Sequence, residues 1–157
     1  MRVRQRVYFG IRSAELDPEE LTRLVGLVPD ETRAKASSVA DPPRPAANLW
    51  ELSSGVDSSA NLDDHLDSLF AKIEPASENI RVLVQSGDVV AVIQVVREFG
   101  AATEDFDEST YGLDPKVVDE GVRRLGAQHP FLSFHLGPEL VAFLSYTGIE
   151  IDFDEYG

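Results

Sequence analysis

Three carboxylates close to the end of the sequence have the spacing of a chemical site. Glu150, Asp152 and Asp154 alternate with apolar residues in a strand-like run, so their side chains share one face. Carboxylates spaced in this way can bind a divalent cation, or act as an acid/base pair where the environment separates their pKa values. A solvated strand face, or ion pairs with arginines of another strand, explains the same pattern and is the simpler interpretation.

The three histidines could supply a general base, because imidazole titrates near neutral pH. His65, His129 and His135 include no pair at the i, i+4 spacing of a helical metal site. His135 shares a predicted strand face with Phe131 and Ser133, so it is either a buried, hydrogen-bonded histidine or a pocket residue. The motif G-x-S-x-G is missing from the sequence, and a Ser–His–Asp triad is therefore not predicted.

Metal and cofactor sites are not predicted elsewhere. Residues 63–67 include metal-ligand types, but Asp63 and Asp64 fall in the first turn of a helix, where the helix dipole favours acids. His65 points to a different side of that helix from Asp63 and Asp67. The sequence contains no cysteine, which excludes disulfides and thiolate sites. Glycine-rich phosphate loops are missing too, so neither a metal nor a cofactor is expected.

Trp50, the single tryptophan, is a candidate for contact with a ligand or a partner. By strand alternation Trp50 and Leu52 share one face. A buried core anchor is the ordinary role of such a tryptophan. The alternative is the wall of a binding groove, with Tyr8, Arg33 and Lys35 nearby.

The charge of the chain restricts its partners. Its net charge is −14, which favours a basic protein partner and argues against nucleic acid and anionic membranes. An acidic stretch at residues 104–108 surrounds Phe106 and precedes Tyr111. Aromatic residues among acids can dock on a basic surface, although a solvated loop that folds back on the protein explains them equally simply.

The elements that position these residues begin with a strand at residues 2–12. Its alternation separates an apolar face (Val3, Val7, Phe9, Ile11) from an arginine row (Arg2, Arg4, Arg6, Arg12). Such a strand is typical of an antiparallel sheet that is covered on one face. A helix follows, with Asp17 as its cap, Pro18 at its first position, Glu20 as the capping-box partner and Pro29 at its end.

The remaining elements follow from periodicity and turn residues. We expect an exposed loop at 30–48, a strand at 49–53, and a helix that Asn61 caps and that stops before Pro75. Residues 77–85 fit either a helix or a strand, and the apolar residues 89–99 predict a central strand. An acidic insertion at 101–129 precedes a strand at 131–136, a helix at 138–146 and a strand at 149–153.

Both ends therefore show a strand–helix–strand unit, which predicts an α+β fold. The expected architecture is a mainly antiparallel sheet with helices on one face, as in ferredoxin-like or similar sandwiches. If the first and last strands are neighbours in that sheet, the arginine row should form ion pairs with Glu150, Asp152 and Asp154. The length of 157 residues suits a single domain at 1–157.

The sequence resembles the domain-of-unknown-function (DUF) family 4279 of bacterial proteins. The similar segments are VYFGI at 7–11, LDPEEL at 16–21, GLVP at 26–29, NLW at 48–50, IEP at 73–75, LGPEL at 136–140 and GIEIDFDEY at 148–156. The resemblance implies an α+β fold and favours a helix at 77–85. It implies no activity, because the family carries none that is established.

Three functions are consistent with the sequence. The first is a non-catalytic, immunity-like module that neutralises a basic partner through an acidic surface. The second is an enzyme or small-molecule binder with a pocket lined by Trp50, His135, Asp152 and Asp154. The third is an oligomer in which edge strands of two copies pair. With no signal-peptide core at the start and no run of roughly 18 apolar residues, we expect a cytoplasmic protein without membrane association.

Overall fold

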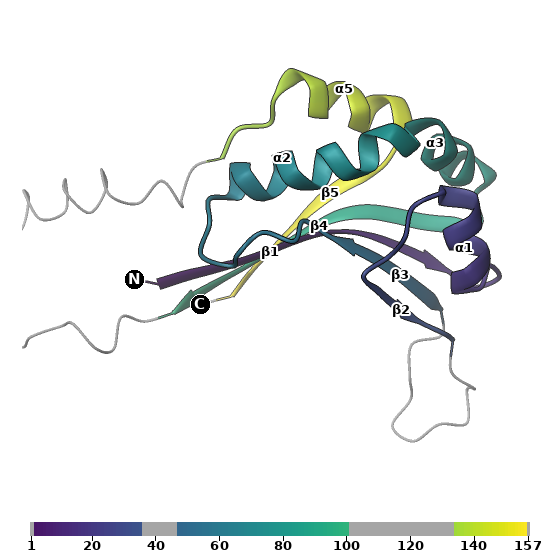
Figure 1. Ribbon diagram of the computed structural model, residues 1–157, viewed down its shortest axis with the longest axis horizontal. Coiled ribbons are helices and arrows are strands. Elements are labelled where there is room, and N and C mark those ends of the chain that lie inside the picture. The colour runs from purple at the N-terminus through teal and green to yellow at the C-terminus, as the bar shows by residue number, and fades with distance from the viewer. Residues whose placement is uncertain (1, 36–46, 101–133, 157) are drawn as a thin grey trace, which may run out of the picture.

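The computed structural model describes residues 2–35, 47–100 and 134–156, which form an α+β fold (Figure 1). A five-stranded sheet in the order β2-β3-β1-β4-β5 carries the helices on one face. The elements in chain order are β1 (Arg2–Ser13), α1 (Pro18–Val25), β2 (Glu31–Arg33), β3 (Asn48–Ser53), α2 (Leu62–Ile73), the short 3-10 helix η1 (Glu74–Ala76), α3 (Ser77–Ser86), β4 (Val89–Gly100), α5 (Pro138–Thr147) and β5 (Glu150–Tyr156).

β1 organises the sheet, as its alternation predicts. It pairs antiparallel with β4 along its whole length and with β3 along its second half. Val7, Phe9 and Ile11 are buried beneath the helices, whereas Arg6 and Arg12 are exposed on the other face. Burying alternate apolar side chains on one face alone is what sets the register of such a strand.

The start of α1 is confirmed, and its predicted end at Pro29 is wrong. The Asp17 carboxylate accepts a hydrogen bond from the Glu20 backbone N–H at 2.8 Å, and Pro18 occupies the first turn. The Glu20 side chain bonds Arg23 at 3.0 Å rather than completing a capping box. Gly26 ends the helix at a left-handed φ of 78°, a conformation that glycine adopts at low cost.

The helix α2 and the segment after it match the sequence in most respects. Asn61 is the residue before α2, but its side chain makes no capping hydrogen bond. α2 ends at Ile73, before Pro75, and η1 then leads into α3. Residues 77–85 are therefore helical, as the family resemblance implied, because Ile80 and Leu83 bury one face of α3 against the core.

Two predictions about loops and strands need correction. Within the expected loop at 30–48, residues 31–33 form β2, which pairs with β3. The expected strand at 131–136 is wrong for residues 134–136, which precede α5 without strand structure. The insertion at 101–129 and residues 36–46 of the loop lie outside the described residues.

The prediction that the first and last strands are neighbours in the sheet is also wrong. β4 lies between β1 and β5, pairing antiparallel with β1 and parallel with β5. The arginine row therefore makes no ion pair with the carboxylates of β5 in the described part of the chain. Arg6 instead bonds Glu51 of β3 at 2.9 Å.

The core fills the space between the helices and the sheet. Buried side chains from β1, β3, β4 and every described α-helix form one apolar cluster. Its largest fully buried members are Trp50, Phe9 and Ile11, each at most 1% exposed. Among the described residues no helix has the length and apolar character needed to span a membrane.

Candidate functional site

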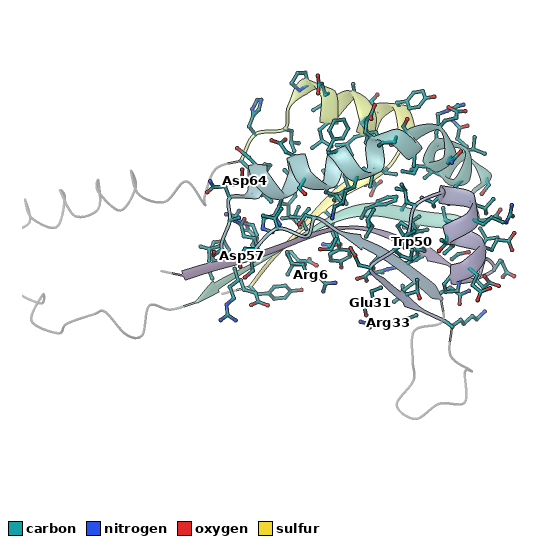
Figure 2. All side chains as sticks on the ribbon, viewed as in Figure 1. Arg6, Glu31, Arg33, Trp50, Asp57 and Asp64 are labelled. Atoms are coloured by element: carbon teal, nitrogen blue, oxygen red, sulfur yellow. The ribbon has the colours of Figure 1, made fainter. Side chains whose placement is uncertain are left out.

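Trp50 is a core residue and does not line a groove. It is fully buried on the helix-covered face of β3, and its indole N–H donates to the Thr22 hydroxyl at 3.0 Å. Phe9 packs against it edge to face, with ring centroids 6.0 Å apart. Figure 2 shows Trp50 among the packed side chains beside α1, away from Arg6, Glu31 and Arg33 below the sheet.

Tyr8 and Arg33 lie together on the opposite, helix-free face of the sheet. The Arg6 guanidinium stands 4.6 Å from the Tyr8 ring centroid and bonds Glu51. Burial and the Glu51 carboxylate raise the pKa of Tyr8. Arg33 bonds Glu31 at 2.6 Å, and this hydrogen bond raises the pKa of Arg33. These charges compensate one another locally, as surface ion pairs commonly do.

Asp152 and Asp154 share this face with Tyr8, on the far side of β4. The amide of Gln94 donates to both carboxylates, at 3.3 Å to Asp152 and 3.1 Å to Asp154. Gln94 is only 6% exposed, so both acids accept hydrogen bonds from a buried amide. In the described part of the chain neither acid has a salt bridge.

His135 is separate from these residues. It is exposed in the segment before α5, where its backbone N–H donates to Asp63 at 2.9 Å. The predicted pocket of Trp50, His135, Asp152 and Asp154 is therefore wrong, because the sheet separates Trp50 from the two acids. Phe106 and Tyr111 lie outside the described residues.

His65 forms a buried pair with Ser54. Its Nδ1 lies 2.7 Å from the Ser54 hydroxyl, and its Nε2 lies 3.1 Å from the Asp57 backbone carbonyl. A carbonyl accepts only, so Nε2 carries the proton and Nδ1 accepts from Ser54. Ser54 is 3% and His65 1% exposed, and among the residues that the structure describes no carboxylate bonds the imidazole to complete a triad. The pair joins the loop before α2 to the core and is closed to a substrate.

A groove lies between α2 and α5 on the helical layer, and the sequence patterns did not indicate it. Its volume is about 580 Å³, and its lining comes from α2, η1, α3 and α5: Phe70, Ala71, Glu74, Ser77, Glu139, Ala142, Phe143 and Tyr146. Phe70 and Phe143 meet edge to face on its floor at 5.5 Å. Phe70 of α2 is only partly buried and packs against the core cluster.

The charges around this groove are acidic. Glu74 and Glu139 are exposed in its lining, which contains no lysine, arginine or histidine. At one end, Tyr146 donates to Glu78, and Arg81 binds Glu78 at 2.6 Å. The hydrogen bonds from Arg81 and Tyr146 lower the pKa of Glu78 to about 2. Arg81 at this end is therefore already engaged by Glu78.

The lining of this groove is suited to binding another molecule. The described residues contain no group of three or more histidine and acidic side chains that could hold a metal ion. Apolar floors with acidic rims are instead suited to contact with a basic, partly apolar surface.

Comparison with known proteins gives one match. The model of the family described as "Domain of unknown function (DUF4279)" matches residues 2–120. No curated protein and no solved structure matches the chain. The matched residues include α2 and α3, whereas α5 follows them, so the groove joins the family segment to an element beyond it.

Proposed function

The chain belongs to the DUF4279 family, and we propose that it is a non-catalytic module that binds a basic, amphipathic segment of a partner protein in the α2–α5 groove. The observation that carries this proposal is the lining of the groove. Its floor is apolar, its rim carries Glu74 and Glu139, and no cation of the lining compensates them.

The chemistry of the partner follows from that lining. A helix that presents apolar side chains at i and i+3 or i+4 can place them against Phe70 and Phe143, which is the usual helix-in-groove mode. Lysines or arginines beside that apolar stripe would then face the two glutamates. The net charge of −14 would increase the association rate of such a partner by long-range attraction.

Neutralisation of a basic protein is one concrete form of this function. A module that covers a cationic surface would block the contacts of that surface with nucleic acid or membranes, which depend on the same charges. The acids of the helical layer give this form its support. Glu19, Asp63, Asp64, Asp67, Glu74 and Glu139 are all exposed there.

The test is comparative affinity capture from the native host. The wild-type chain, a groove variant (Glu74→Lys with Glu139→Lys) and a control variant (Glu19→Lys with Asp88→Lys) carry tags, and the captured proteins are quantified by mass spectrometry. Both variants change the net charge equally, but Glu19 and Asp88 do not line the groove.

The proposal expects one basic protein that the wild type and the control retain and that the groove variant loses. Retention should fall as salt rises from about 0.05 to about 0.5 M, because screening shortens the range of charge attraction. Equal capture by the groove variant would contradict the proposal, as would a partner lost equally from the control.

A further inference from the structure

The helix-free face of the sheet carries a basic row on β1 and an acidic row on β5, and no salt bridge joins the two rows in the described residues. We call this the open face; it is the side of the sheet opposite the helices (Figure 1). Arg4 and Arg12 of β1 are exposed on it, and within the described residues neither makes a hydrogen bond or salt bridge. Glu150, Asp152 and Asp154 of β5 carry the opposite charge.

These charges do not pair with one another in the described chain, where β4 lies between them. In register, Arg6 is opposite Val96, and Val96 is opposite Asp154. Two strand spacings put the backbones of β1 and β5 about 10 Å apart. The side chains of β4 between them are mostly apolar: Val90 is 67% exposed, and Val92 and Val96 are partly exposed.

We propose that the open face is the interface between two copies of this chain, related by a two-fold axis that runs parallel to β4. Rotation about such an axis places β4 over β4 of the second copy and β1 over its β5. Arg6 then lies over Asp154 of the second copy, and Arg12 lies near its Glu150. The valines of the two β4 strands meet at the centre.

The register makes this orientation specific. An axis perpendicular to the strands would place β1 over β1 of the second copy, so that arginines meet arginines. The parallel axis instead places each arginine row over the acidic row of the other copy. This contact occurs twice, since a two-fold interface repeats each contact. It also brings the Tyr8 hydroxyl over Asp152, to which it can donate.

The size and charge of the open face are compatible with a dimer. From strand lengths and ordinary spacing, the face covers on the order of 600 Å², near the roughly 800 Å² that each partner contributes to a standard interface. The net charge of −14 opposes self-association, but acids of α1 and α2 lie on the other side of the sheet. Salt screens the repulsion between these acids of the two copies beyond about 8 Å.

Sedimentation equilibrium with charge-swapped variants tests the proposal. One variant carries Arg6→Glu and Arg12→Glu, and the other carries Glu150→Arg and Asp154→Arg. Each variant alone should dimerise at least tenfold more weakly than the wild type, because like charges then face each other at both contacts of the proposed register. An equimolar mixture should form a heterodimer at least as tight as the wild-type dimer.

A variant with Glu19→Arg and Asp67→Arg serves as the control, since it matches the charge change of the second variant at exposed helical positions on the other side of the sheet. Its dimer dissociation constant should stay within twofold of the wild-type value. A monomeric wild type at about 0.1 mM protein and low salt would overturn the proposal, as would a mixture that associates no better than its components. Either result leaves the groove proposal intact, because capture of a partner is measured separately.

Discussion

The Ser54 hydroxyl donates to Nδ1 of His65 across 2.7 Å, and both residues are buried. Nε2 of the same ring donates to the Asp57 carbonyl. The imidazole is thus held neutral between one donor and one acceptor, and it connects the loop after β3 with α2.

This geometry predicts a dependence of stability on pH. Burial lowers the pKa of His65, and the weaker opposing effects of the Asp57 carbonyl and the Asp64 carboxylate do not reverse it. A lowered folded-state pKa means that the unfolded chain binds the proton more readily. The contribution of His65 to stability is therefore complete above the unfolded pKa of about 6.5 and is lost as pH falls through the folded pKa.

Urea unfolding at several pH values checks this prediction, with His65→Gln as the comparison. The wild type should lose more unfolding free energy than His65→Gln between neutral and mildly acidic pH. The acidic side chains titrate in both proteins, so the difference between the two curves isolates His65. Parallel curves would show that the ring does not titrate in this range.

Trp50 should behave as a buried anchor in fluorescence and in stability. As the single tryptophan it should emit at short wavelength and resist quenching by iodide, since it is fully buried. Trp50→Ala should cost about 3–5 kcal/mol of unfolding free energy through the cavity it leaves. Thr22→Val, which removes the partner of the indole N–H, should cost about 1–3 kcal/mol. A readily quenched Trp50 would contradict this placement.

Gly26 should tolerate alanine less well than Gly87. Both glycines end helices at positive φ, 78° and 79°, so alanine should cost about 1–2 kcal/mol at either position through backbone strain. A Cβ at Gly26 would also lie 3.3 Å from the Asn79 amide nitrogen, whereas one at Gly87 meets nothing within 4 Å. Thermal unfolding of both variants should therefore show a larger loss for Gly26→Ala. Equal losses would mean that Asn79 moves aside freely.

Glu51 should control the ionisation of Tyr8. Burial and the Glu51 carboxylate raise the pKa of Tyr8, while Arg6 opposes them. Glu51→Gln should therefore lower this pKa. Absorbance titration at alkaline pH, with Tyr8→Phe subtracted, measures the change. Glu98→Gln changes the same charge on the same face without affecting Tyr8 and is the control; an equal shift in both variants would contradict the assignment.

Much of the local structure could be predicted from the sequence. The alternation of β1, the Asp17 cap of α1, and the stop of α2 before Pro75 depend on neighbours within a few residues. Residues 77–85 were ambiguous because their apolar positions suit both the helical and the strand periodicity. Burial of Ile80 and Leu83 against the rest of the core makes these residues helical.

The sites were less predictable, because each depends on segments far apart in the chain. Tyr8, Arg33, Asp152 and Asp154 do share one face, as strand alternation allows. Trp50 lies on the other face of that sheet, and His135 lies near the start of α2, so no common pocket forms. The groove depends on α5 packing beside α2, a contact that neither helix encodes alone.

The sequence by itself determined the α+β class, the apolar face of β1 and the charged rows of β1 and β5, because alternation and capping are local. The tertiary structure decided which strand lies between those rows. β4 takes that position because its long apolar run buries Ile93 and Val95 beneath the helices while pairing on both edges. Its position keeps the arginine row of β1 apart from the acidic row of β5 on the open face, so the expected ion pairs do not form.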